Sequence, residues 1–144
     1  MKMIHQTSLQ INQSASTIFA VLSFPGHFPA FIPAIKRATW VDESPLQIGK
    51  AYLEMREAMG SSAIAKVRVS KYEPPYRIAY KSTAMGITGE YIYTLKEENG
   101  QTMITFESWA GASGLANLLL PLFVKAMKKD STQLQLLKKY VEDD

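Results

Sequence analysis

The stretch ITGEYIYTLKEENGQTMITFESW, residues 87–109, predicts a β-hairpin. Its two halves, 87–96 and 102–109, are rich in the β-branched and aromatic residues that favour strands. Between them lies Asn99-Gly100, a dipeptide that strongly favours a tight hairpin turn because both positions accept a positive φ. The fold is therefore expected to contain an antiparallel sheet.

More strands are expected upstream of this hairpin. The first of them alternates between apolar and polar residues, as a half-buried strand does. Two others flank a turn at Gly60-Ser61 and should form a second hairpin. The five upstream strand candidates are residues 3–12, 35–43, 49–59, 62–72 and 76–84.

Helices are expected at both ends of the chain. Ser14 is placed to cap a short helix over 15–22, and residues 28–33 predict a second, very short helix or turn. Near the C-terminus, residues spaced by three and four draw one stripe along a long helix. That helix should start near Leu119 or Leu120, with Pro121 in its first turn. The stripe consists of Leu120, Phe123, Met127, Ser131, Leu134, Leu137 and Val141.

These elements predict an α+β fold in one domain, residues 1–144. A sheet that is apolar on one face needs a cover, and the long C-terminal helix is the element large enough to provide it. No internal repeat or linker divides the sequence.

The composition excludes several classes of function. The chain has 144 residues, of which 47% are hydrophobic and none is cysteine, so disulfides, thiolate zinc sites and cysteine nucleophiles are excluded. The net charge of +3 is too small to favour nucleic-acid binding. No apolar run approaches the ~20 residues of a membrane-spanning helix. We expect a cytoplasmic protein without stable membrane insertion.

Several segments resemble the SRPBCC superfamily of START-like and Bet v 1-like helix-grip proteins, and within it the polyketide cyclase/dehydrase-type branch. The resemblance covers nearly the whole chain and keeps the order of elements. It implies a sheet of about seven strands wrapped around a long C-terminal helix, with a ligand cavity between them. The segments are INQSASTIFAVL (11–22), FPAFIP (28–33), IG (48–49), YEPP (72–75), GQT (100–102) and the helix end at 134–142.

Strand alternation predicts which side chains face such a cavity. Within 49–59, the apolar set of Ala51, Leu53, Met55 and Met59 should point inward and carry Glu57 with it. The following strand contributes small inward residues that leave room for a ligand. The predicted ligand-binding residues are Leu53, Met55, Glu57, Val67, Tyr80, Ser82, Tyr91, Tyr93, Phe106, Ser108, Leu119 and Phe123.

Glu57 is the candidate catalytic residue. A buried carboxylate would act as a general base, whereas a carboxylate near the Gly60 turn would simply be exposed to water. His5 and His27 lack the spacing of metal ligands, so neither a metal nor a cofactor is expected. The leucine-rich segment 115–123 is either a gate for an apolar ligand or ordinary core.

Three functions remain open at this point. The first is binding or transport of a small hydrophobic or amphipathic molecule, such as a lipid, a quinone or a polyketide-like compound. The second is a cyclase/aromatase-like enzyme that uses Glu57 and cavity tyrosines. The third is a co-chaperone-like interaction module, which would need a large exposed apolar patch.

Overall fold

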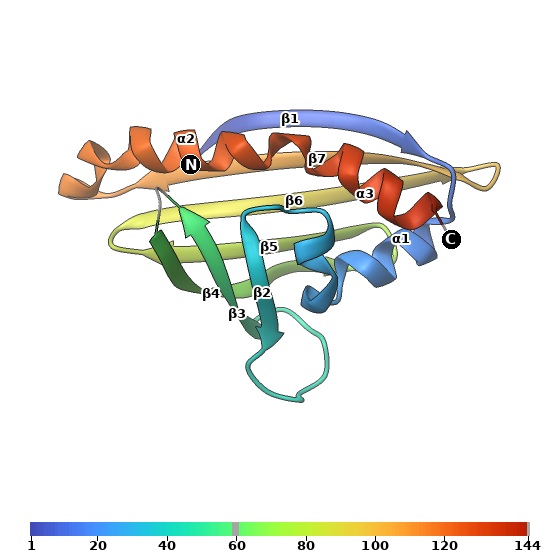
Figure 1. Ribbon diagram of the computed structural model, residues 1–144, viewed down its shortest axis with the longest axis horizontal. Helices are drawn as coiled ribbons and strands as arrows, with labels where there is room; N and C mark the ends of the chain where they lie inside the picture. Colours follow the sequence, from blue (N-terminus) through green and yellow to red (C-terminus); the bar gives the residue numbers. More distant parts are fainter. Residues whose placement is uncertain (59–60, 144) are drawn as a thin grey trace.

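A computed structural model describes residues 1–58 and 61–143. Seven strands form one antiparallel sheet in the order β1-β7-β6-β5-β4-β3-β2, and the C-terminal helix runs along it (Figure 1). No helix in these described ranges is long and apolar enough to cross a membrane. The strands are β1 (Lys2–Ile11), β2 (Ile35–Trp40), β3 (Ala51–Ala58), β4 (Ser61–Glu73), β5 (Arg77–Ala84), β6 (Ile87–Glu98) and β7 (Gln101–Ala112).

The central hairpin confirms the prediction from Asn99-Gly100. Glu98 pairs with Gln101, which leaves a two-residue turn between β6 and β7. Asn99 and Gly100 have φ values of 54° and 78°. Both lie in the left-handed region that this type of turn requires.

Gly100→Ala is therefore expected to lower the free energy of unfolding by about 1 kcal/mol, the cost of a side chain in the left-handed region. A Cβ at this position would meet no atom within 4 Å, so the effect would come from the backbone alone. Urea unfolding measures it, with the exposed Glu98→Ala as control. A Gly100→Ala variant as stable as that control would contradict the assignment.

The helices near the N-terminus also follow the prediction. The first, α1 (Ala15–Leu22), is capped by Ser14, whose hydroxyl accepts a hydrogen bond from the backbone N–H of Thr17 at 3.2 Å. A short 3₁₀ helix follows, η1 (Pro25–Ala30). Together with the C-terminal end of the last helix they close one end of the sheet (Figure 1).

The C-terminal helix begins at Leu120 as expected, with Pro121 in its first turn, but it is not uniform. It consists of α2 (Leu120–Lys128), the 3₁₀ segment η3 (Lys129–Thr132) and α3 (Gln133–Glu142). A further 3₁₀ turn, η2 (Gly114–Leu118), precedes it. The tightened segment η3 was not predicted, and it holds the buried Asp130.

The core lies between the concave face of the sheet, α1 and α3. Its fully buried apolar side chains come from each of these elements and from the segment after η1. They include Ile11, Ile18, Leu22, Phe31, Val69, Ile78, Ile104, Phe106 and Leu137. None of these fully buried side chains comes from α2, in which Met127 is the buried residue.

Candidate functional site

A cavity of about 190 Å³ lies between the concave face of the sheet and α2. An engineered cavity of about 150 Å³ holds benzene, so this one has room for roughly one substituted aromatic ring. Its walls are mostly apolar. The lining residues are Tyr52, Glu54, Arg56, Ala65, Val67, Tyr80, Ser82, Ala84, Ile87, Gly89, Tyr91, Phe123, Ala126 and Met127.

Small residues of the sheet create this space beneath α2. Ala65 and Ala84 have little side chain to fill it, and Gly89 has none. A Cβ built on Gly89 would lie 3.1 Å from the ring of Phe123 and 3.7 Å from the terminal methyl of Met127. Because Gly89 has no side chain, Phe123 and Met127 of α2 can pack against this part of the sheet, and they form the roof of the cavity.

Aromatic rings close the cavity toward η1. The rings of Phe28, Tyr52 and Tyr80 lie 5.4–5.5 Å apart and meet edge to face, an arrangement that aromatic pairs prefer. The hydroxyl of Tyr80 donates a hydrogen bond to the carbonyl of Leu22 at 2.5 Å. These three rings belong to the hydrophobic core, so the core itself forms this wall of the cavity.

The structure places five of the predicted residues on the cavity lining: Val67, Tyr80, Ser82, Tyr91 and Phe123. Four others lie elsewhere. Tyr93, Phe106 and Ser108 are buried on the same face of the sheet but are not part of the lining. Leu119, just before α2, is 45% exposed and is not part of the cavity lining either.

The predicted inward face of β3 is wrong. Leu53 is 45% exposed, Met55 is only half-buried and lies outside the lining, and the Glu57 side chain is 62% exposed. Glu57 forms a surface ion pair with Lys36 at 3.7 Å, so it cannot serve as a buried base. Met59, assigned to the same face, lies outside the described residues.

The pairing of β3 with β4 explains the inversion. Residues directly opposite each other in an antiparallel pair point to the same face. Val67 pairs with Tyr52, and Ala65 pairs with Glu54. Because Val67 and Ala65 of β4 face the cavity, the even-numbered residues of β3 face it too. The sequence prediction had favoured the more apolar odd-numbered set.

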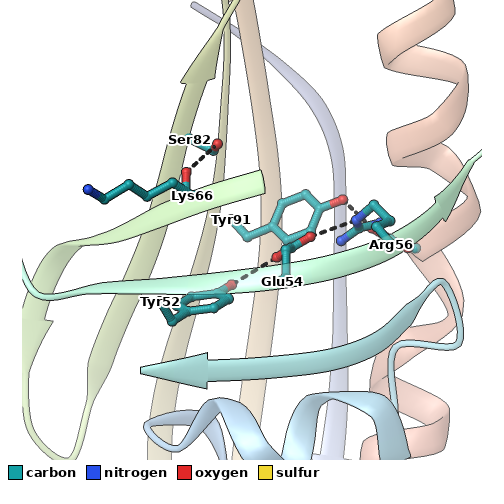
Figure 2. Close-up of polar contacts among 7 residues, drawn as sticks. Tyr52, Glu54, Arg56, Lys66, Ser82 and Tyr91 are labelled. Atoms are coloured by element: carbon teal, nitrogen blue, oxygen red, sulfur yellow. Dashed lines mark hydrogen bonds and ion pairs between the residues drawn. The ribbon is translucent and has the colours of Figure 1, made fainter. Parts of the chain in front are cut away.

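A buried polar cluster is centred on Arg56 (Figure 2). Sequence reasoning predicted one of its members, Tyr91, and missed the others, which are Tyr52, Glu54, Arg56 and Asp130. Arg56 donates from Nε to Glu54 Oε2 at 2.7 Å and from Nη1 to Asp130 Oδ2 at 2.8 Å. Tyr52 donates its hydroxyl to Glu54 Oε1 at 3.1 Å, and Tyr91 donates to Asp130 Oδ2. The cluster thus joins strands β3 and β6 to the 3₁₀ segment of the C-terminal helix.

Burial controls the protonation of this cluster. Loss of solvent, followed by the nearby carboxylates, raises the pKa of Tyr52 and Tyr91 well above the ordinary value. Burial alone would lower the pKa of Arg56, but the charges of Glu54 and Asp130 outweigh it and raise that pKa. The two hydroxyls therefore stay protonated donors at neutral pH, and the guanidinium stays charged.

Asp130 could have been found from the sequence. The spacing of three and four that includes Met127 and Leu134 is satisfied by Asp130 as well as by Ser131. The structure buries Asp130 at 1% exposure, while Ser131 is half-buried. Its carboxylate is drawn inward because Arg56 and Tyr91 bind it, which is why a charged residue lies on the inner side of this helix.

A few buried polar atoms near the cluster keep unused hydrogen-bonding capacity. Tyr93 donates to Oε1 of Gln133, but Nε2 of Gln133 has no partner in the described part of the chain. The same is true there of Oδ1 of Asp130 and the hydroxyl of Ser108. Ser108 pairs with Tyr91 across β6 and β7, so its hydroxyl lies on the same face of the sheet as the cluster.

Exposed apolar side chains surround the α2 end of the molecule. Leu115, Leu118 and Met85 are each about 80% exposed or more, and Leu122 is 51% exposed. The β5–β6 turn lies against η2, since a Cβ on Gly86 would approach Ala116 to 2.9 Å. The leucines at 115 and 118 are therefore not core residues, and they lie beside the roof of the cavity.

The sheet, the C-terminal helix and the cavity between them define a helix-grip domain of the START and Bet v 1 type. Residues 4–142 match the family described as polyketide cyclase/dehydrase and lipid transport, and the chain belongs to this family. No curated protein matches the sequence significantly.

Solved structures share the fold at low sequence identity. The protein TTHA0849 from Thermus thermophilus is 12% identical, with a TM-score of 0.74 and coverage of 96% of both chains. The aromatase/cyclase Zhui from Streptomyces sp. R1128 is 14% identical, with a TM-score of 0.73 over 96% of this chain and 92% of its own. A START superfamily protein from Mycobacterium smegmatis is 14% identical, with a TM-score of 0.71 and coverages of 96% and 97%.

Proposed function

We propose that residues 1–144 form one ligand-binding domain whose cavity holds a small, largely apolar molecule with one polar end. The observation that carries the proposal is a mostly apolar cavity of about 190 Å³, in which the charged residues of the described lining, Glu54 and Arg56, form one cluster. Apolar walls supply affinity and a few placed polar groups fix orientation, as in most small-molecule sites. The family description, which includes lipid transport, is consistent with such a role.

The size of the cavity favours a compact ligand. An extended acyl chain would be longer than the cavity can hold. A substituted aromatic ring would fit, with its polar group against Arg56 and Tyr91. Native mass spectrometry of gently purified protein, followed by solvent extraction, would identify a bound species of either kind.

A cavity-filling variant tests the proposal directly. In Ala65→Phe the new ring would occupy much of the space, so binding of the neutral probe 4-butylbenzamide is expected to fall at least about tenfold. Isothermal titration calorimetry measures this. Ala20→Phe, at an exposed alanine of α1, is the matched control and should bind as the wild type does. Absence of binding to the wild type, or equal binding to Ala65→Phe, would refute the proposal.

A second candidate function is proton transfer at a carbon next to a carbonyl. Glu54 lines the cavity beside Arg56, whose guanidinium keeps N–H groups beyond the two that its carboxylate partners use. Glu54 would take the α-proton and become neutral, and the C–H electron pair would form the enolate. The enolate would then replace the charge of Glu54, so no third anion is added, and a remaining N–H of Arg56 would donate to the enolate oxygen.

Deuterium exchange separates this chemistry from simple binding. With 1-tetralone in D₂O, an enzyme would replace the α-protons faster than buffer alone, and Glu54→Gln would abolish the gain. NMR follows the loss of the α-proton signal. Exchange at the buffer rate, with the ketone bound, would favour a binding protein.

A further inference from the structure

The charges around the cavity are unbalanced. Of the residues in the described lining, Glu54 and Arg56 are charged, and Asp130 lies directly behind Arg56. The Glu54 and Asp130 side chains are almost completely buried, and that of Arg56 is 23% exposed. Two carboxylates and one guanidinium give this cluster a net charge of −1.

The positive charge of Arg56 is already used. Its Nε and Nη1 atoms each donate to a carboxylate at 2.7–2.8 Å, so its attraction for a third anion is cancelled by the two it holds. Because the Glu54 and Asp130 side chains are almost completely buried, their repulsion of another carboxylate is only weakly screened. A ligand carboxylate would lose its hydration without gaining a cation of its own.

The same cluster suits a neutral polar group. The hydroxyls of Tyr52 and Tyr91 donate hydrogen bonds to the carboxylates, and their oxygens can still accept a hydrogen bond from a ligand. Arg56 keeps N–H groups that can donate to a carbonyl or hydroxyl oxygen. A group that both donates and accepts, such as an amide, a phenol or a hydroxyketone, therefore finds partners without adding charge.

We propose that the cavity selects small aromatic or alicyclic molecules with a neutral polar end and rejects those with a carboxylate or phosphate. This inference rests on the proposed binding function and narrows its ligand class. It separates free fatty acids and other anionic amphiphiles from the compounds that the cavity accepts.

Two probes of nearly the same shape test the inference. 4-Butylbenzamide and 4-butylbenzoate differ mainly in charge at neutral pH. The amide is expected to bind the wild-type protein at least about tenfold more tightly than the carboxylate, because the two probes offer the apolar walls the same surface. Isothermal titration calorimetry gives both dissociation constants.

Charge variants show whether the cluster causes the preference. Glu54→Gln brings the net charge to zero, so the ratio between amide and carboxylate should shrink several-fold. Asp130→Asn makes the same change from the helix side and serves if the first variant unfolds. Glu57→Gln removes one negative charge from the exposed face of the same strand and should keep the wild-type ratio.

The outcomes separate the two proposals. Equal binding of amide and carboxylate, or tighter binding of the carboxylate, overturns the inference and leaves the binding function standing. A ratio unchanged in both Glu54→Gln and Asp130→Asn also overturns it. Failure of the amide to bind at all overturns the binding function and the inference together.

Discussion

Arg56→Met is expected to lower the free energy of unfolding by about 3–5 kcal/mol at neutral pH, since removal of one partner leaves buried charge uncompensated. Glu54 and Asp130, both nearly inaccessible to water, would face each other across the cavity wall without a cation. Urea unfolding followed by circular dichroism measures the loss. Arg37→Met, at an exposed arginine of the neighbouring strand β2, is the matched control and should change stability by less than about 0.5 kcal/mol.

A triple variant sharpens this test. When Glu54→Gln and Asp130→Asn are added to Arg56→Met, no buried charge remains in the cluster, and most of the lost stability should return. A single Arg56→Met variant as stable as the Arg37→Met control would show that the cluster is not a structural ion-pair network. A triple variant no better than the single one would show that the loss comes from packing.

Alkaline pH is expected to unfold the protein over a narrow range. Burial raises the pKa of Tyr52, Tyr80, Tyr91 and Tyr93 above the ordinary value of about 10. A group whose folded-state pKa is raised stabilises the fold below its unfolded pKa, and that stability is lost as the pH rises above it. One pH unit above 10, four such hydroxyls together remove about 5–6 kcal/mol.

The absorbance of tyrosinate near 295 nm, recorded together with circular dichroism, checks this expectation. The four hydroxyls should ionise in the same narrow interval in which the secondary structure disappears. Tyr80→Phe should reduce the dependence of stability on pH by about one quarter. Ile11→Val, at a fully buried residue of the edge strand β1, should lower stability at every pH without changing that dependence. Ionisation of all four hydroxyls while the fold persists would contradict the expected burial.

The sequence was sufficient for the architecture because its decisive signals are local. Asn99-Gly100 specifies a turn, Ser14 a helix cap and Pro121 a helix start, and each acts through the backbone of a few neighbouring residues. The resemblance to helix-grip proteins rested on such positions. It therefore predicted the fold well and left the ligand open.

The site was harder to predict because it depends on strand register and on contacts between distant residues. For β3, hydrophobicity favoured Leu53 and Met55 as the inward residues. The alternate residues Lys50, Tyr52, Glu54 and Arg56 matched the pattern of a face exposed to solvent. Yet β3 and β4 pair odd-numbered with even-numbered residues, so an inward Val67 requires an inward Tyr52. The choice between Asp130 and Ser131 needed the position of Arg56, a residue 74 positions earlier in the chain.

The order of strands sets the sequence of events by which the chain folds. From β2 to β7, each strand pairs with its neighbour in sequence, and these hairpins can form one after another. β1 instead pairs with β7 at the opposite edge from β2, so that the hydroxyls of Ser8 and Thr105, 97 residues apart, share a hydrogen bond. Closing so long a loop is slow, and pairings of this kind delay folding. The first strand of this sheet in sequence order, β1, is thus expected to be the last to join it, and until it does the edge of β7 is open to other chains.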